Sequence, residues 1–292
     1  SGSSQDFTSP VRYTVTSQDK NWKRIYAVTV REQKASNIPT TFHFEKVRLV
    51  QQAYQEFYEE QDGGNELVWA SGNKGFRWAM SKAEVEDYPT VQYENGKVGK
   101  CAKLETRLTG DLGNMVGMPI AAGNLFIGSF DMLNAITNPL SATRFGTPFY
   151  NRPLRLTGYY KYKAGEKFYE NGGYTDRKDM MNIYAIFYDG VNYDSAGKAI
   201  DVTLDGHLPD NNYEHSNMVA LALMSNPHET DEWEHFDIPF DYARYGKKID
   251  EAKLAKGEYK ISLIFASSKD GAVFEGAPGS TLLIDEVELI YE

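Results

Sequence analysis

Two tryptophans on either side of a polar loop are the side chains best suited to hold a polar, ring-shaped ligand such as a sugar. Trp69 and Trp78 flank residues 71–75, which read SGNKG and include Asn73. A sugar ring packs its C–H face on an aromatic ring, while its hydroxyl groups need convergent hydrogen-bonding partners. Trp69, Asn73 and Trp78 are therefore the first candidate ligand-binding residues.

Other predicted strands extend this candidate set. On the strand predicted over residues 154–162, Arg155 and Tyr159 share the outward face. The remaining candidates are aromatic residues of two other strands and two serines at a strand end: Tyr184, Trp233, Ser267 and Ser268. For any single aromatic residue the alternative is packing in the core, because aromatic side chains dominate cores as well as binding sites.

Paired carboxylates are a second chemistry to consider, since a glycoside hydrolase needs two of them about 5 to 10 Å apart. The chain has 41 acidic residues, and no spacing singles out a pair. Asp131, Asp179, Asp189 and Glu275 lie at predicted strand ends or in loops, with ordinary solvated carboxylates as the alternative. The sequence lacks a phosphate-binding loop, a zinc-ligand spacing and a Gly-x-Ser-x-Gly elbow, and Cys101 on its predicted strand is expected to be inert.

The elements that must position these side chains are mostly strands. Alternating or continuous apolar runs predict strands over residues 42–50, 66–70, 99–108, 125–130, 154–162, 182–189, 218–224, 233–240, 259–266 and 281–291. Short helices are expected at 50–60 and 250–255, and a helical turn at 132–138. Long loops are expected at 111–119, 138–153, 165–179 and 189–215. Many strands with few helical periods predict an all-β sandwich.

Two of the predicted strands carry an acidic residue on an apolar face. Asp285 lies between Leu283 and Val287 on one face of the last strand, and Glu45 shares a face with Val47 near the first. An inward carboxylate is costly unless it is paired, hydrogen-bonded or bound to a cation. Glu45 and Asp285 are therefore candidate metal ligands, and their oxygens suit Ca²⁺. Backbone amides or a lysine are the alternative partners.

The first residues form a separate predicted piece. Alternating strands over residues 11–17 and 24–30, joined by the polar turn 18–21, predict a β-hairpin. Residues 34–40 read as a linker, which gives a short first segment, 1–37, and one main domain, 38–292. A hairpin packed on the main domain is the alternative. The opening Ser-Gly-Ser-Ser looks like the start of a trimmed or mature chain.

Composition narrows the range of partners. The net charge of −10 argues against nucleic-acid binding, which needs basic patches to neutralise phosphates. The sequence contains no run of about 18 apolar residues, so it predicts no membrane-spanning helix. Cys101 is the only cysteine, so the chain has no internal disulfide, and cysteine usage does not locate the protein.

Three motifs together resemble a known family. They read IAAGNLFIGSF (120–130), GTPFYNRPLRLTGYYKY (146–162) and ASSKDGAVFEGAPGSTLLIDEVELIY (266–291). In this order they resemble the putative carbohydrate metabolism domain family of Bacteroidetes bacteria, over about residues 40 to 292. The predicted hairpin resembles the end of an immunoglobulin-like domain that precedes many Bacteroidetes surface modules.

The resemblance implies a jelly-roll sandwich, similar to carbohydrate-binding modules, with a partial Ig-like hairpin before it. It also implies a secreted protein at the cell surface or in the periplasm of a Gram-negative bacterium, and we expect a lipid anchor on a cysteine upstream of this sequence. We expect the protein to be a monomer. Related jelly rolls join a first-strand Glu and a last-strand Asp at a structural calcium ion, which fits Glu45 and Asp285.

These observations predict non-catalytic binding of an oligo- or polysaccharide, with a role in carbohydrate metabolism or uptake. A glycoside hydrolase or lyase on the same fold is the first alternative, since fold alone does not decide function. A structural spacer or adhesin domain is the second. A concave aromatic site would favour binding, and two close carboxylates in a pocket would favour hydrolysis.

Overall fold

The computed structural model describes residues 11–28, 38–61 and 65–292, which divide between two compact units, Ser1–Ala35 and Ser36–Glu292. The expected linker residues 34–37, the opening Ser-Gly-Ser-Ser and the centre of the 61–65 turn lie outside the described residues. In the first unit, β1 (Val11–Thr16) and β2 (Lys23–Val28) form the predicted antiparallel hairpin. That this hairpin ends an Ig-like domain stays a prediction.

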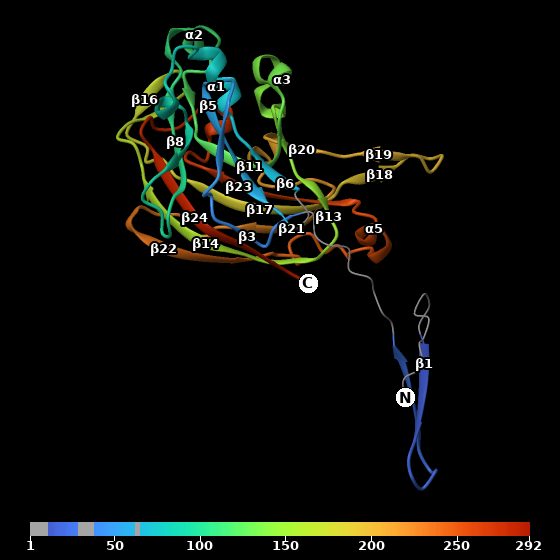
Figure 1. Ribbon diagram of the computed structural model, residues 1–292. Helices are drawn as coiled ribbons and strands as arrows, with labels where there is room; N and C mark the ends of the chain where they lie inside the picture. The colour runs from blue at the N-terminus through green and yellow to red at the C-terminus, as the bar shows by residue number, and fades with distance from the viewer. Residues whose placement is uncertain (1–10, 29–37, 62–64) are drawn as a thin grey trace. The chain divides into compact units, whose positions relative to one another are not determined.

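The second unit is a sandwich of two antiparallel sheets, which confirms the predicted all-β fold (Figure 1). The first sheet runs in the order β21-β17-β23-β11-β6-β5-β4 and the second in the order β22-β14-β24-β8-β7. The strands of the first sheet are β4 (Val47–Val50), β5 (Tyr54–Glu60), β6 (Glu66–Ala70), β11 (Asn124–Phe130), β12 (Thr143–Phe145), β13 (Thr147–Phe149), β17 (Asn182–Asp189), β20 (Leu204–Asp205), β21 (Met218–Leu223) and β23 (Tyr259–Ala266). Those of the second are β3 (Thr41–Phe42), β7 (Thr90–Tyr93), β8 (Cys101–Glu105), β14 (Pro153–Lys163), β22 (Thr230–Pro239) and β24 (Thr281–Tyr291).

Short elements connect the strands of the two sheets. Three small hairpins pair β9 (Arg107–Leu108) with β10 (Ile120–Ala121), β15 (Phe168–Glu170) with β16 (Gly173–Thr175), and β18 (Val191–Tyr193) with β19 (Ala199–Asp201). The helices are α1 (Asn73–Ala79), α2 (Gly110–Met115), α3 (Met132–Thr137), α4 (His207–Asp210) and α5 (Glu251–Ala255), with 3₁₀ turns η2 (Val85–Asp87), η3 (Pro139–Ser141) and η4 (Gly271–Val273). No helix among the described residues is long and apolar enough to cross a membrane.

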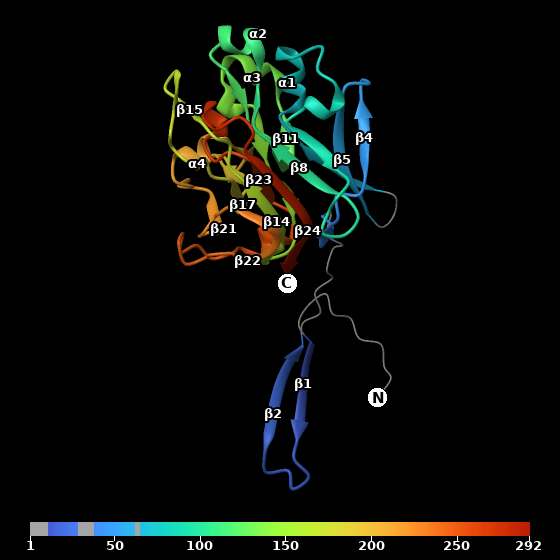
Figure 2. The same cartoon turned by 90° about the vertical axis from the view of Figure 1, so that its left-hand side faces the viewer.

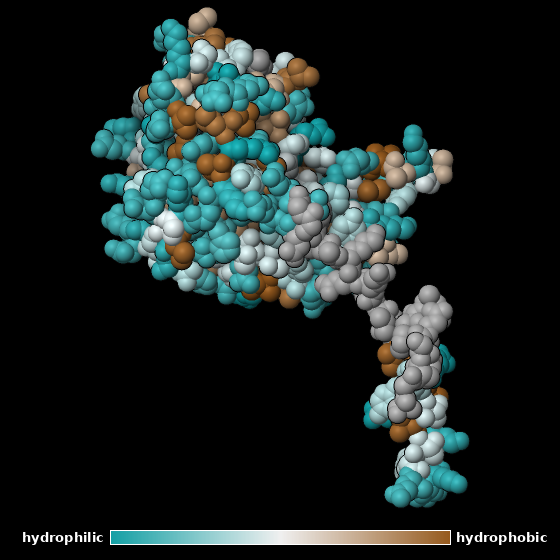
Figure 3. Space-filling view, in the orientation of Figure 1, coloured by the Kyte–Doolittle hydropathy of each residue, from teal (hydrophilic) through white to brown (hydrophobic). Residues whose placement is uncertain are grey.

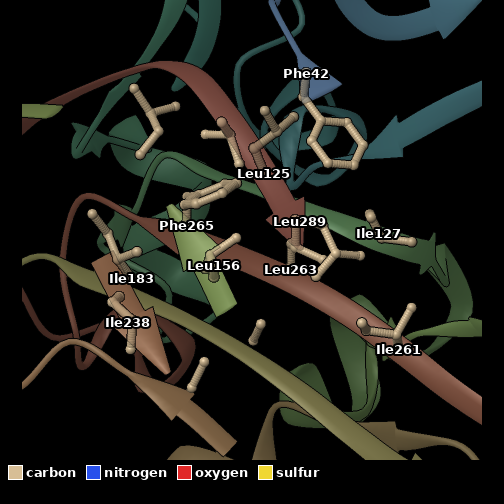
Figure 4. Packing of buried hydrophobic residues seen from close by; sticks show 14 of the residues in the cluster. Phe42, Leu125, Ile127, Leu156, Ile183, Ile238, Ile261, Leu263, Phe265 and Leu289 are labelled. Carbon is tan, nitrogen blue, oxygen red and sulfur yellow. The ribbon is translucent and has the colours of Figure 1, made fainter. Parts of the chain in front are cut away.

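The main core fills the space between the two sheets. Alternation along β11 turns Leu125 and Ile127 inward, and alternation along β23 does the same for Leu263 and Phe265. Leu156 of β14 meets them from the second sheet (Figure 4). Each such side chain is at most 1% exposed, and full burial of one contributes about 1.5 to 3 kcal/mol.

Of the three predicted helical segments, one is wrong. The helix expected at 50–60 is instead a turn followed by β5, because Gln51 and Gln52 adopt positive φ angles of 50° and 55°. That backbone lets Val50 pair with Tyr54 in a β-ladder. The helix expected at 250–255 and the turn expected at 132–138 are confirmed as α5 and α3.

The face predicted for the last strand is also wrong, because β24 contains a bulge. Glu286 has a φ of 47°, and the pairing with β14 shifts register between Thr157 and Tyr159. Leu282 and Ile284 therefore point into the core before the bulge, and Val287 does so after it. Asp285 lies on the other face, paired with Tyr159.

Candidate functional site

The side of the first sheet that faces away from the main core is also apolar. On β11, β23 and β17, three residues in register form a row: Phe126, Ile264 and Tyr184. The next row, at the ends of the same strands, consists of Asn124, Ala266 and Asn182. An apolar face of this kind must be covered, and short helices and loops cover it.

The covering segments gather at one end of the sandwich. In Figures 1 and 2, α1, α2 and α3 lie together at one end of the domain. Between them and the sheet lies a cavity of ≈160 Å³. We call it the apolar pocket, and its aromatic lining consists of Phe76, Trp78, Phe126, Phe130, Phe145, Tyr184 and Phe274.

A buried amide fixes the position of α1 at this pocket. The Asn73 side chain donates from Nδ2 to the carbonyl oxygens of Thr90 at 2.7 Å and Gln55 at 3.3 Å, and its Oδ1 accepts from the Thr90 N–H at 3.1 Å. One residue earlier, the Gly72 N–H donates to Asn124 Oδ1 at 2.7 Å. The segment thus anchored carries Trp78 to the edge of the pocket, where it is 38% exposed.

Helix α3 and the turn η3 form a wall with two different sides. Asp131 caps α3 by accepting hydrogen bonds from the N–H groups of Leu133 at 2.9 Å and Asn134 at 3.5 Å. Ala135 and Pro139 face the apolar pocket, whereas Asn134 faces a second, polar cleft on the other side. The wall therefore separates an apolar cavity from a polar one.

The polar cleft has a volume of ≈310 Å³ and contains two carboxylates. Asp205 accepts from Ser141 Oγ at 2.9 Å and from the His207 N–H at 3.1 Å. Asp201 accepts from Lys260 Nζ at 2.7 Å. Both carboxylates are thus already engaged, and within the described residues the neighbouring Arg144 forms no ion pair.

The polar groups of the apolar pocket are few. Lys269 is exposed at its edge and forms no ion pair in the part of the chain that the structure describes. Asn182 exchanges hydrogen bonds with the Tyr213 hydroxyl, at 2.9 and 3.3 Å. Asn124 lines the pocket, and its Nδ2, by contrast, donates no hydrogen bond to any described residue.

Exposed apolar side chains surround this end of the molecule. On and just after α2, Leu112, Met115 and Val116 are 39%, 83% and 40% exposed, and Leu133 of α3 is 84% exposed. Figure 3 shows brown, hydrophobic atoms near α1 and α2 on a mostly teal surface. Exposed apolar groups that gather around a pocket are typical of a binding surface.

The predicted serines do not offer free hydroxyls. Ser267 and Ser268 are 0% and 1% exposed, and both hydrogen-bond to Thr106 Oγ1, at 2.8 and 2.5 Å. Ser268 Oγ also donates to Asp179 Oδ2 at 2.6 Å, as does Ser280 Oγ at 2.7 Å. Burial raises the pKa of Asp179, while these hydrogen bonds oppose that rise. The structure thus gives both hydroxyls other partners: Ser268, which lines the pocket, holds the buried Asp179 together with Ser280, whereas Ser267 Oγ accepts from the Gly123 N–H at 3.0 Å.

Two members of the loop prediction are interior residues. Trp69 is 1% exposed in the main core, where its ring packs on Phe42 at 5.2 Å, Phe44 at 5.5 Å and Phe265 at 5.9 Å between centroids. Asn73 is 0% exposed and bonded as described above. The prediction that Trp69 and Asn73 contact a ligand is therefore wrong, because alternation along β6 turns the tryptophan inward. Trp78 alone of this group reaches the pocket's edge.

Three other candidates lie on the outer face of the second sheet. Arg155 Nε donates to Asp237 Oδ1 at 2.6 Å. The Tyr159 ring packs edge-on against His235 at 5.1 Å between centroids. The Trp233 ring lies under a lysine ammonium group, Lys161 Nζ, 5.5 Å from its centroid. Tyr184, in contrast, is 2% exposed on the pocket floor. The predicted residues thus fall on opposite faces of the sandwich and do not form one site.

Glu45 and Asp285 meet at the loop that joins β7 to β8. Asp285 Oδ2 accepts from the Val98 N–H at 3.0 Å, and Glu45 Oε1 accepts from the Lys100 N–H at 2.9 Å. Burial raises the pKa of Asp285 to about 6, despite these hydrogen bonds. Burial, followed by the charges of Asp285 and Glu45, raises the pKa of the Cys101 thiol to about 12.

The fit of this pair to calcium is partial. Ca²⁺ takes about 6 to 8 oxygen ligands, and Glu45 and Asp285 would supply two side chains of that set. The described residues contain no group of three or more His, Cys, Asp or Glu side chains placed to hold a metal. Backbone amides, the alternative partners, are the ones found. The calcium site therefore stays a prediction.

The paired-carboxylate candidates have separate roles. Asp131 caps α3, Asp179 is buried among serines, and Asp189 forms an ion pair with Lys253. Glu275 Oε1 accepts from the Asn171 N–H at 3.3 Å. No aspartate, glutamate or histidine is among the described residues that line the apolar pocket.

Sequence reasoning missed the floor of the pocket, although the pattern contained a clue. Along β17 all residues from Asn182 to Tyr188 are buried. On β11, Phe126 and the residues on either side of it are also buried. A strand that is apolar on both faces needs a covering layer on each side. This feature predicts a covering layer over the outer face of the sheet. A search for that layer would have pointed to Asn124, Phe126 and Phe274.

Comparisons with known proteins agree with this architecture. Residues 43–290 match the family described as putative carbohydrate metabolism domain, and residues 1–30 match the family described as SGBP, N-terminal. A crystal structure of a putative glycoside hydrolase from Bacteroides vulgatus ATCC 8482 is 52% identical, covers 88% of this chain and 100% of that chain, and has a TM-score of 0.82. Another, from Bacteroides thetaiotaomicron VPI-5482, is 46% identical, covers 100% of this chain and 82% of that chain, and has a TM-score of 0.79. No curated protein matches the chain.

Proposed function

Because the chain belongs to the family of putative carbohydrate metabolism domains, we propose that it binds a glycan at the apolar pocket without cleaving it. Membership of that family, which the three sequence motifs predicted, supports a carbohydrate-related role. The partner is an oligo- or polysaccharide, and the protein acts outside the inner membrane. The match of residues 1–30 to a family of SGBP N-terminal domains supports that location. The lipid anchor and the monomeric state belong to the same proposal.

The observation that carries the proposal is the position of Trp78 at the edge of an aromatic-lined cavity. Its ring is 38% exposed, so part of its face is free to stack on a sugar ring. In the same pocket lining, Asn124 Nδ2 has no acceptor among the described residues and is available to a hydroxyl oxygen. Lys269 adds three donors at the same edge.

The lining of the pocket favours binding over hydrolysis. The usual glycosidase mechanisms need two carboxyl groups on opposite sides of the scissile bond. None of the described lining residues carries one, and the buried Asp179 is fully occupied by Ser268, Ser280 and the Ala277 N–H. The presence of a concave aromatic site also favours glycan binding over the role of a structural spacer.

Hydrolysis is the second candidate, and the polar cleft is the observation that favours it. Asp201 and Asp205 lie in one cleft beside Arg144, which forms no ion pair with any residue that the structure describes. Two solved relatives are also named putative glycoside hydrolases. Against this candidate, each of the two carboxylates is held by a neighbour, Lys260 for Asp201 and Ser141 for Asp205.

A glycan-array screen of the full chain, with chromatography of every ligand after incubation, separates the two candidates. We expect at least one glycan to bind and to be recovered intact. Recovery of shortened products that disappear in Asp205→Asn would instead establish hydrolysis at the polar cleft. Binding that is unchanged in Trp78→Ala would show that the apolar pocket is not the glycan site.

A further inference from the structure

The apolar pocket is more hydrophobic than a sugar requires. Its floor row of Phe126, Ile264 and Tyr184 lies behind the row that contains the two asparagines. The opposite walls add the small and apolar side chains of Ala135, Pro139 and others on the covering segments. A sugar placed this deep would lose water from its hydroxyl groups and find few hydrogen-bonding partners.

The size of the cavity suits one aromatic ring. Its volume is ≈160 Å³, and an apolar cavity of about 150 Å³ in a protein interior binds benzene. The pocket's own rings already meet edge to face, since Phe126 and Phe145 lie 5.4 Å apart at 88°. Phe145 and Tyr184 do the same at 6.4 Å and 89°. An added ring would extend this packing in the arrangement that aromatic rings prefer.

The polar groups are placed to hold the rest of such a ligand at the edge. Trp78 is 38% exposed, Lys269 is exposed, and Asn124 occupies the row at the strand ends. A ligand with one apolar and one polar end would therefore meet matching chemistry at both ends. A bare glycan would leave the inner part of the cavity without a partner.

We propose that the ligand is a glycan that carries an aromatic ring, as an aryl glycoside or an aromatic ester, with that ring inside the apolar pocket and the sugar against Trp78. This inference rests on the proposed glycan binding and specifies its substrate class. No bond is made or broken. The covering segments exclude water from the ring, and the edge residues select the sugar.

Calorimetry with matched small ligands tests this inference on the full chain. The probes are the phenyl and methyl glycosides of glucose, galactose, mannose and xylose, together with phenol. For the sugars that bind, we expect the phenyl glycoside to bind at least about tenfold more tightly than the methyl glycoside, because the ring leaves water for an apolar cavity. Equal affinity of the phenyl and methyl forms would overturn the inference and leave glycan binding intact.

Phenol distinguishes failure of the inference from failure of the proposed function. If phenol binds as tightly as every phenyl glycoside, the sugar contributes nothing and both glycan binding and the inference are overturned. If phenol binds at least about tenfold more weakly than the best phenyl glycoside, sugar and ring act together, which supports both.

Filling the cavity provides the matched variant. Ala266 lines the pocket, and Ala266→Leu should remove the preference for the phenyl glycoside, measured as the ratio of phenyl to methyl glycoside affinity. Ala199→Leu, on the exposed strand β19, is the control and should preserve the preference. Ala135→Leu on α3 fills the same cavity from the opposite wall, and serves if Ala266→Leu does not fold. A full phenyl preference in a folded filled variant would contradict the inference.

Discussion

The two outer faces of the sandwich both carry aromatic side chains, but those of the first sheet lie under short helices and line the apolar pocket. On the second sheet, Tyr159 and Trp233 are partly exposed, each within 6 Å of a lysine ammonium group, at 4.8 Å and 5.5 Å. On the first sheet, Tyr184 and Phe126 lie under a layer of short helices and enclose the apolar pocket. The comparison shows that the covering layer, rather than the presence of aromatic rings, creates a candidate site.

The largest expected effect separates an interior tryptophan from a surface one. Trp69→Ala should lower the free energy of unfolding by about 3 to 5 kcal/mol, because it leaves a cavity among Phe42, Phe44 and Phe265. Trp233→Ala should cost less than about 1 kcal/mol, the scale of an exposed cation–π contact. Urea unfolding measures both, and similar losses would contradict the assignment of the two faces.

A milder change at the same core position sharpens this result. Trp69 Nε1 has no hydrogen-bond partner among the described residues, so Trp69→Phe removes a buried donor while keeping most of the packing. Its cost should be well below that of Trp69→Ala. An equal cost would show that Nε1 is bonded in solution.

Asp285, beneath the loop that joins β7 to β8, should make the free energy of unfolding depend on pH. Burial raises the pKa of Asp285 from 3.8 to about 6, so the folded state holds this proton more tightly than the unfolded chain. The resulting stability is present below about pH 4 and is lost as the pH rises to about 6, by up to about 3 kcal/mol. Relative to Asp285→Asn, the native chain should therefore lose stability across this window in denaturant titrations. A constant difference would show that the carboxyl group is not perturbed.

Calcium would act on the same carboxylate in the opposite sense, since a bound cation favours the charged form. If Glu45 and Asp285 bind Ca²⁺, the ion at 100 times its Kd should stabilise the fold by about 2.7 kcal/mol, and EDTA should lower the Tm. Glu45→Gln is the matched control and should abolish the shift. An EDTA-insensitive Tm would leave the Val98 and Lys100 amides as the partners of the two carboxylates.

The smallest effect concerns the open face itself. Arg155 and Asp237 form an ion pair in which each side chain is 42% exposed. Arg155→Ala should change the free energy of unfolding by less than about 1 kcal/mol, because exposed pairs contribute little. It should also leave glycan affinity unchanged. A loss of affinity would make the second face part of the binding site.

Much of the fold followed from alternation of apolar residues, as in β11 and β23, and from the closing motif of β24. Alternation failed where the backbone departs from regular pairing. At Glu286 a bulge moves Asp285 to the opposite face, and at Gln51 and Gln52 positive φ angles replace an expected helix with a turn. These positive φ angles occur at residues other than glycine, so the residue types did not predict them.

The site was less predictable than the fold. The sequence singled out both Trp69 and Trp78 beside a predicted loop, but residues 73–79 form α1. Trp78 lies on that helix at the edge of the pocket, whereas alternation along β6 turns Trp69 into the core. The apolar pocket joins residues from β11, β17, β23 and distant loops, and this proximity depends on long-range pairing. Buried positions on both faces of β17 were the one local feature that indicated a covering layer.

The most direct measurement compares Trp78→Ala with Trp233→Ala by calorimetry, using the best ligand from the glycan array. Both variants remove one partly exposed tryptophan, one from the edge of the apolar pocket and one from the second sheet. We expect Trp78→Ala to weaken binding about tenfold, the scale of one lost stacking contact, and Trp233→Ala to change it less than about twofold. The reverse pattern, or an equal effect of both, would contradict the assignment of the glycan site to the apolar pocket.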